Sequence, residues 1–141
     1  MSSIKFQSVK KNFDDVQVVK DFSIEVNDGE FVAFLGPSGC GKTTCLRMLA
    51  GLEHPSAGAI RIGEKTVYDS TEKIFVPPEK RNIGMVFQSY AVWPHMNVFD
   101  DVDYHLKIQK LPKSEIKDRV FDILEVVELT GLENRMPNQL S

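Results

Sequence analysis

The first 90 residues alternate short apolar runs with polar turns, a pattern typical of β-strands. The runs mix β-branched and aromatic residues, and apolar and polar positions partly alternate within them. The segments predicted as strands are IKFQSV (4–9), VQVV (16–19), FSIEV (22–26), FVAFL (31–35), AIRI (59–62) and IGMVF (83–87). Residues 31–35 and 83–87 are apolar throughout, as expected of strands buried on both faces. The stretch from 63 to 81 is polar and is broken by Pro77-Pro78.

Three other segments have helical periodicity. KTTCLRMLAGL (42–52) fits a helix that ends near Gly51. After residue 90, apolar residues recur at four-residue spacing, which predicts two more helices whose apolar stripes form core. The first is capped by Asn97 and carries Val98, Val102 and Leu106; the second is capped by Ser114 and carries Ile116, Val120, Ile123, Leu124 and Val127. The chain is therefore strand-rich up to about residue 90 and helical after it.

Charge and composition narrow the function classes. The net charge of −3 argues against non-specific nucleic-acid binding, which needs many cations to displace phosphate counterions. The longest apolar run, 31–35, is far shorter than the ~18–20 residues of a membrane span. The N-terminal MSSIKFQSVKK lacks the apolar stretch of a signal peptide, so we expect a cytosolic chain unless a partner carries it to a membrane. For the same reason Cys40 and Cys45 are expected to be reduced.

Residues 36–43 match G-x-x-x-x-G-K-[ST], the phosphate-loop motif, between a predicted strand and a predicted helix. With the next threonine, the loop comprises Gly36, Pro37, Ser38, Gly39, Cys40, Gly41, Lys42, Thr43 and Thr44. Glycines let the backbone curl so that successive N–H groups point into one cavity, and a helix N-terminus adds positive potential for phosphate oxygens. Lys42 is predicted to reach the β- and γ-phosphates, and the Thr43 hydroxyl to ligate Mg²⁺.

Two other classes of phosphate-loop protein fit the sequence poorly. A small GTPase would carry D-x-x-G and N-K-x-D after the loop, and this chain contains neither. Nucleotide kinases usually carry the loop close to the N-terminus, whereas about 35 strand-rich residues precede it here.

Three stretches together point to one family. They are DFSIEVNDGEFVAFLGPSGCGKTTCLRMLAGLEHPSAGAIRIG (21–63), PPEKRNIGMVFQSYAVWPHMNV (77–98) and NQLS (138–141). In them the chain resembles the ATP-binding subunits of ABC transporters, in the branch that imports sugars, polyamines, ferric iron and similar solutes. The resemblance implies an α/β fold: a P-loop NTPase (RecA-like) core with an N-terminal antiparallel β-subdomain and a partial helical subdomain. Residues 1–90 would hold the core, the β-subdomain, the phosphate loop (Walker A) and the Q-loop, and residues 91–141 the helical subdomain.

The resemblance also implies roles for single residues. Phe13 occupies the position of the aromatic residue that stacks on adenine, and a flat π-face is chemically adequate for that task. Gln88 matches the Q-loop glutamine, which ligates Mg²⁺ and senses the γ-phosphate. Leu140-Ser141 begins the LSGGQ signature, which contacts the ATP of a second subunit. Read without the resemblance, Phe13 is a core residue and Gln88 a solvated one.

The loop after Gln88 is the expected contact with a membrane partner. Tyr90, Val92, Trp93 and His95 lie where importers of this type receive the coupling helix of the permease. The alternative is that these residues form an aromatic cluster that closes the helical subdomain. His54, His95 and His105 are too scattered for a metal site, so none is expected.

The residues that hydrolyse ATP in this family have no counterpart in the chain. Hydrolysis requires a base that polarises water and a second carboxylate that holds Mg²⁺, which the family supplies from an apolar strand ending in Asp-Glu (Walker B) and a switch histidine. No four-residue apolar run precedes an Asp-Glu pair here, and the signature stops at Leu140-Ser141. We therefore expect a truncated chain that is inactive as an ATPase by itself.

The leading hypothesis is the N-terminal part of an ABC importer ATPase that binds ATP and Mg²⁺ and couples hydrolysis to solute uptake. Its expected partners are a second ATPase subunit in a head-to-tail dimer, permease subunits at Tyr90–His95 and, indirectly, an extracytoplasmic solute-binding protein, on the cytoplasmic face of the cell membrane. The alternative is a catalytically incomplete nucleotide-binding fragment. A third reading, a soluble ABC ATPase of DNA repair or translation, is disfavoured because repair types carry a long coiled coil after the Q-loop, where this chain has only residues 89–141.

Overall fold

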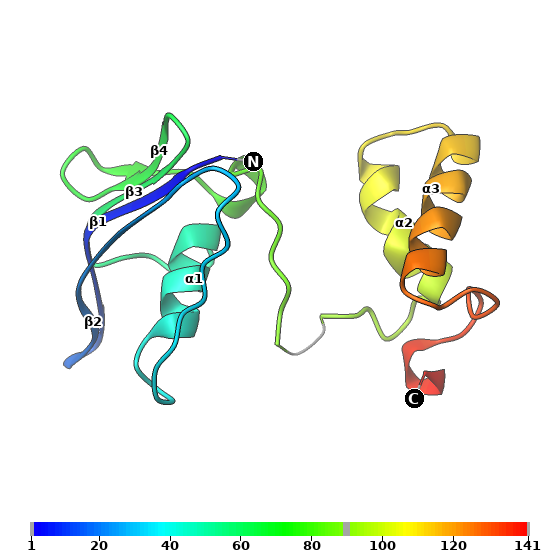
Figure 1. Cartoon of the computed structure of the whole chain (residues 1–141), viewed down its shortest axis with the longest axis horizontal. Helices are drawn as coiled ribbons and strands as arrows, with labels where there is room; N and C mark the ends of the chain where they lie inside the picture. Colours follow the sequence, from blue (N-terminus) through cyan, green and yellow to red (C-terminus); the bar gives the residue numbers. More distant parts are fainter. Residues whose placement is uncertain (1, 89–90, 141) are drawn as a thin grey trace. The chain divides into compact units, whose positions relative to one another are not determined.

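The computed structural model describes residues 2–88 and 91–140. The chain divides into two compact units, Met1–Met85 and Val86–Ser141. The first contains a sheet and one helix of nine residues, and the second contains a pair of longer helices (Figure 1). Each unit has its own hydrophobic core.

The first unit is built on a five-stranded antiparallel sheet in the order β2-β1-β3-β4-β5. Its strands are β1 (Ile4–Phe13), β2 (Val16–Val26), β3 (Ala57–Ile62), β4 (Lys65–Asp69) and β5 (Ile74–Phe75). β1 and β2 form a hairpin in which Phe13 pairs with Val16 across the turn Asp14-Asp15. The strands predicted at 4–9 and 59–62 are confirmed, and those at 16–19 and 22–26 are parts of the single strand β2.

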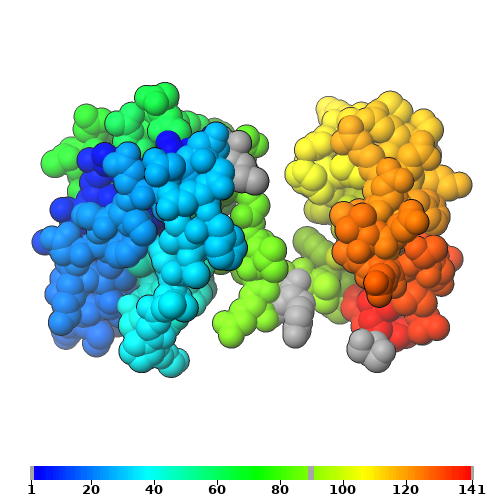
Figure 2. All heavy atoms as spheres, in the orientation of Figure 1, coloured from blue at the N-terminus to red at the C-terminus, as the bar shows by residue number. Residues whose placement is uncertain are grey.

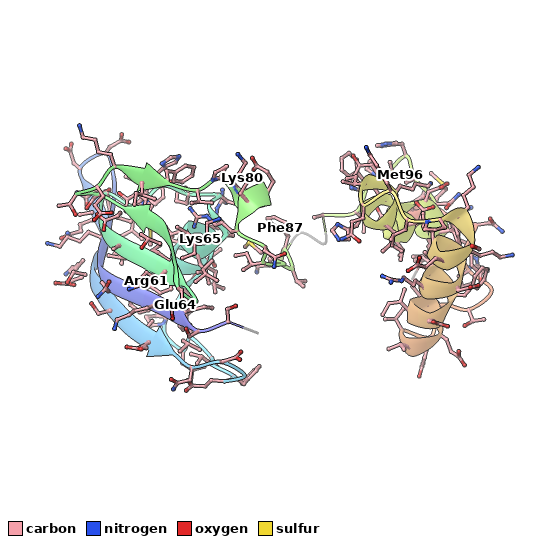
Figure 3. All side chains as sticks on the ribbon, turned by 90° about the horizontal axis from the view of Figure 1, so that it is seen from above. Arg61, Glu64, Lys65, Lys80, Phe87 and Met96 are labelled. Atoms are coloured by element: carbon pink, nitrogen blue, oxygen red, sulfur yellow. The ribbon has the colours of Figure 1, made fainter. Side chains whose placement is uncertain are left out.

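β4 and β5 lie in the polar stretch for which no strand was predicted. Val67 is fully buried, and the buried Tyr68 donates its hydroxyl to the Pro55 carbonyl (2.8 Å). Lys65 of β4 donates to the Lys80 carbonyl (3.1 Å) in the 3-10 helix Pro78–Lys80, and Figure 3 shows this lysine together with Lys80. Each of these two strands has only one or two apolar residues, and such a pattern is too short to predict a strand.

Helix α1 (Lys42–Ala50) packs against the sheet, and the core of the first unit contains side chains from both. The buried members are Phe6, Val9, Val19, Cys45, Met48, Ile60, Val67 and Tyr68. The helix ends at Gly51 as predicted, where a left-handed φ of +79° turns the chain so that the Leu52 N–H donates to the Arg47 carbonyl (2.9 Å). This packing holds the beginning of α1, and the loop before it, against the sheet.

The strands predicted at 31–35 and 83–87 are wrong. Within residues 2–88 and 91–140, neither segment pairs with another strand. Phe31, Leu35 and Val86 are 93%, 91% and 97% exposed. An apolar strand of this kind needs neighbouring strands beside it and cover on both faces. Both segments therefore present apolar surface.

The second unit contains α2 (Val98–Ile108) and α3 (Lys113–Val126), which pack around the buried residues Val98, Ile116, Val120 and Leu124. The predicted cap at Asn97 is confirmed, because its side-chain oxygen accepts from the Asp100 N–H (2.8 Å). Val102 and Leu106 are partly buried against the same core, as the four-residue spacing predicts.

The start and one edge of α3 differ from the prediction. The helix begins at Lys113, because the Pro112 carbonyl accepts the first helical bond from the Ile116 N–H (3.0 Å), so Ser114 is not the cap. Ile123 and Val127 are 45% and 51% exposed instead of core. Ile123 lies at the edge of the buried row, about 100° around the helix from its neighbour Leu124, and Val127 follows the last helical residue, Val126.

None of the helices among the described residues is long and apolar enough to cross a membrane.

Candidate functional site

The predicted phosphate loop forms an open curl that leads into α1. Figure 2 shows the segment leading into α1, in cyan, at the surface of the first unit. Gly39 and Gly41 have φ of +81° and +91°, in the left-handed region that favours glycine. The curl closes through a turn in which the Cys40 N–H approaches the Pro37 carbonyl (3.4 Å), and α1 begins with the bond from Cys45 N–H to Gly41 carbonyl (2.9 Å).

Lys42 folds its ammonium back over this curl. Its Nζ donates to the carbonyls of Gly36 (2.8 Å) and Pro37 (2.7 Å). The cation therefore lies on the loop beside the first turn of α1, where the free N–H groups and the helix dipole already favour an anion. An anion bound there would meet a cation and backbone donors together.

Gly41 holds the loop against the sheet. A Cβ at this position would lie 3.1 Å from Val19 Cγ2 and 3.2 Å from the Val18 carbonyl of β2. A side chain here would force the loop or the strand to shift by a few tenths of an ångström, so the close approach depends on this glycine as well as on its backbone conformation.

The two cysteines have different surroundings. Both are free thiols; Cys40 is exposed in the loop and Cys45 is buried in α1. Burial raises the pKa of the Cys45 thiol, and the neighbouring Cys40 raises it further. Cys45 is therefore a protonated core residue, as the sequence predicts for a small reduced hydrophobe.

Thr43 and Thr44 lie in the first turn of α1, where Thr43 is exposed and Thr44 half-buried. Phe13 lies at the end of β1 with 42% of its surface exposed, and the Lys11 ammonium lies 4.5 Å from the centre of its ring. The structure thus keeps Phe13 available for a ligand. The first unit brings together the loop, both threonines and the hairpin that carries Phe13.

Gln88 is exposed and belongs to the second unit, so its action on Mg²⁺ stays a prediction. Tyr90 and Ser141 lie outside the described residues. Among the residues that are described, no group of three or more His, Cys, Asp or Glu side chains gathers as metal ligands do. His54 stacks on the Phe75 ring at 3.9 Å.

Trp93 is the centre of an aromatic cluster in the second unit. Its ring lies 5.7 Å from that of His95 and 5.4 Å from that of Tyr104, and its backbone N–H donates to Asp101 Oδ1 (3.2 Å). Val92 and Trp93 nevertheless remain 48% and 44% exposed. Both predicted roles of this loop, closure of the unit and contact with a partner, keep support.

Sequence reasoning missed two buried cations that contact the chain at or just after the end of α1. Lys11 is 9% exposed, and its ammonium contacts Glu53 Oε1 at 2.7 Å. Arg81 is 3% exposed and donates to the carbonyls of Val76, Met48 and Leu49 at 2.7–2.8 Å. Burial lowers the pKa of the Arg81 guanidinium. Arg81 thereby binds the end of α1 to the chain before residue 81, and no local pattern in the sequence marks either role.

Comparisons with known proteins agree with this geometry. Residues 19–141 match the family described as ABC transporter. The chain is 53% identical over all 141 residues to the trehalose/maltose import ATP-binding protein MalK of Thermococcus litoralis. It is 49% identical over 138 residues to the spermidine/putrescine import ATP-binding protein PotA of Aliivibrio fischeri. It spans 38% and 36% of the length of these two relatives.

A solved structure gives the same fold. The chain matches the dimeric structure of a post-hydrolysis state of an ATP-binding cassette bound to ADP and Pi, with a TM-score of 0.80 and 28% identity. The match covers 98% of this chain and 63% of that one. The predicted fold class, an α/β P-loop NTPase, is confirmed. The phosphate loop, the sheet that supports it and these matches lead to one conclusion: the chain belongs to the ABC transporter family, with the importer-type ATP-binding subunits among its relatives.

Proposed function

We propose that this chain supplies the MgATP-binding part of an ATPase that drives solute uptake. The observation that carries the proposal is the Lys42 ammonium, held on the Gly36 and Pro37 carbonyls over a glycine curl at the start of α1. A triphosphate would draw the ammonium from these carbonyls to its β- and γ-oxygens and would accept from the loop N–H groups. Neutral carbonyls bind a cation less strongly than phosphate does, so the exchange favours the ligand.

The remaining groups of the site have complementary roles in this proposal. The Thr43 hydroxyl, exposed in the first turn of α1, would ligate Mg²⁺, and Gln88 would supply a second oxygen. Phe13 would stack on the adenine ring. Bound Mg²⁺ would neutralise charge between the phosphates. This chain's own residues bind and orient the nucleotide.

Partners complete the proposed transporter. The relatives named above are import ATP-binding proteins, and the matching solved structure is a dimer, which supports pairing with a second subunit. In the proposed pair, the segment that ends at Ser141 would contact the ATP of that second subunit. The exposed Val92 and Trp93 support docking of a permease at Tyr90–His95, on the cytoplasmic face of the membrane, with a solute-binding protein acting through that permease. Cross-linking from position 92 in the complete transporter tests this contact, and products that lack a permease subunit would contradict it.

The decisive experiment measures ATP binding and turnover. Lys42→Ala removes two charge-assisted hydrogen-bond donors to phosphate, so ATP affinity should fall roughly tenfold or more and turnover by the full-length protein should vanish. The matched control is Lys10→Ala, an exposed lysine on β1. Wild-type turnover by full-length Lys42→Ala would refute the proposal.

The second candidate function is nucleotide binding without hydrolysis by the 141-residue chain itself. Its support is the sequence, which contains no apolar strand that ends in an Asp-Glu pair. Phosphate release by the purified chain separates the two. Steady turnover would reject the binding-only function, and binding without release would support it.

A further inference from the structure

Lys11 is a buried lysine that has no role in the phosphate binding proposed above. Its Nζ lies 2.7 Å from Glu53 Oε1 and donates to the His54 carbonyl at 2.8 Å. Both partners directly follow the end of α1, at Gly51. Burying an ammonium costs free energy unless it is paired and hydrogen-bonded, and here both conditions are met.

The same ammonium lies over the ring of Phe13. Its distance from the ring centroid is 4.5 Å, within the range of a cation–π interaction. Phe13 is 42% exposed, and because the cation occupies one face, the exposed surface belongs mainly to the other face and the edge. Lys11 thus leaves mainly one face of the Phe13 ring accessible to a ligand.

Lys11 also connects this ring to the phosphate loop through the strand that supports the loop. In the β1–β2 ladder it pairs with Val19, the residue whose Cγ2 lies 3.1 Å from the position of a Cβ on Gly41. Its other partner, Glu53, follows the helix whose beginning forms the loop. One lysine therefore contacts the ring, the strand that supports the loop and the chain that leaves α1.

We propose that Lys11 is a positioning residue for the adenine ring, which holds Phe13 as a one-sided stacking surface at a fixed place beside the phosphate loop. The proposal rests on the ATP-binding function proposed above. A cation on one face withdraws π-density from the ring and leaves the opposite face less negative, which favours stacking with the electron-rich face of a purine. The role is specific to the base, because the phosphates are held by the loop.

The test compares ATP with inorganic tripolyphosphate, which has the phosphates without the base. Calorimetric titration of the chain is expected to show that Lys11→Met weakens ATP binding about three- to tenfold and leaves tripolyphosphate binding unchanged. Lys11→Arg, which keeps a cation over the ring, should retain the wild-type ratio of the two affinities. In a Phe13→Ala background, Lys11→Met should have no further effect on ATP affinity.

A second variant separates positioning from folding. Lys11→Met leaves Glu53 without its cation, whereas Lys11→Met/Glu53→Leu removes both charges and leaves neither unpaired. The double variant should show the same loss of ATP affinity at full tripolyphosphate affinity. An unchanged ATP-to-tripolyphosphate ratio in either variant, or an equal loss for both ligands, would overturn the proposal. Failure of the wild-type chain to bind either ligand, or an unaltered Lys42→Ala, would instead refute the ATP-binding function.

Discussion

At the scale of single residues, glycines and buried charges decide the geometry of the site. Gly39 and Gly41 share left-handed backbone conformations, but only Gly41 lies against the sheet, near Val18 and Val19. A Cβ on Gly39 would meet no atom within 4 Å. Alanine substitutions at the two positions therefore separate the free-energy cost of backbone strain from the cost of displacing the loop.

Gly41→Ala is expected to destabilise the first unit by about 2–4 kcal/mol, since backbone strain and overpacking add. Gly39→Ala, the matched control, should cost about 1 kcal/mol from backbone strain alone. Urea denaturation followed by circular dichroism measures both values. Equal costs would show that contact with β2 does not constrain the loop.

The ion pair of Lys11 and Glu53 makes stability depend on pH. The hydrogen bond from Lys11 holds the pKa of Glu53 below its ordinary value. A lowered pKa in the folded state stabilises the protein above the unfolded pKa of about 4.3, and the contribution is lost as pH falls through the folded value. Wild type should therefore lose more stability than Glu53→Gln on acidification below about pH 4.3.

Urea midpoints measured at a series of acidic pH values check this expectation. The Asp69 carboxylate, whose pKa is lowered by its hydrogen bonds to Thr71 and Glu72, is present in both proteins, so the difference between them reports Glu53. Parallel curves for the two proteins would mean that the ion pair contributes nothing measurable.

At the scale of elements, the helix pair shows that apolar residues at four-residue spacing are buried together between the helices. Residues 116, 120 and 124 of α3 face α2, whereas Ile123, the neighbour of Leu124, is 45% exposed. A core of this size depends on few side chains. Truncation of one core side chain should therefore destabilise both helices.

Leu124→Ala is expected to cost about 2–5 kcal/mol and to reduce the helix content of the second unit, because Leu124 is 1% exposed. Ile123→Ala, one residue away, is the control and should cost less than about 1 kcal/mol. Hydrogen exchange of the α3 amides measures both. Similar protection in the two variants would contradict the burial seen at 124.

At the scale of the whole molecule, two apolar segments have no pairing strand among the residues that the structure describes. Phe31 and Leu35 in one segment and Val86 in the other are more than nine-tenths exposed. Exposed apolar segments without a pairing strand promote association with other chains. We expect the 141-residue chain to be marginally stable and prone to self-association.

Val86→Ser should lower this self-association without lowering stability, because the side chain is 97% exposed. Val126→Ser on α3, at a site that is 76% exposed, is the control and should leave association nearly unchanged. Light scattering against concentration measures the effect. A monodisperse wild-type chain with a cooperative melt would contradict the expectation.

The phosphate loop and the helix that follows it could be predicted from sequence, as could the Asn97 cap and the buried residues 116, 120 and 124 of α3. Each depends on residues within a few positions of one another, whose backbone preferences and spacing are local. The loop also carries the family resemblance, which the matches to importer subunits confirm. Sequence alone therefore predicted the loop for which nucleotide binding is proposed, together with its backbone geometry.

The tertiary structure decided what depends on distant partners. Residues 31–35 and 83–87 have the composition of buried strands, but a strand exists only where another strand pairs with it. Lys11 and Arg81 look like surface cations in the sequence, yet folding buries them against carbonyls and a carboxylate far along the chain. Such contacts are set by packing across the core, which no local pattern encodes, and they fix the end of α1 to residues that are distant in the sequence.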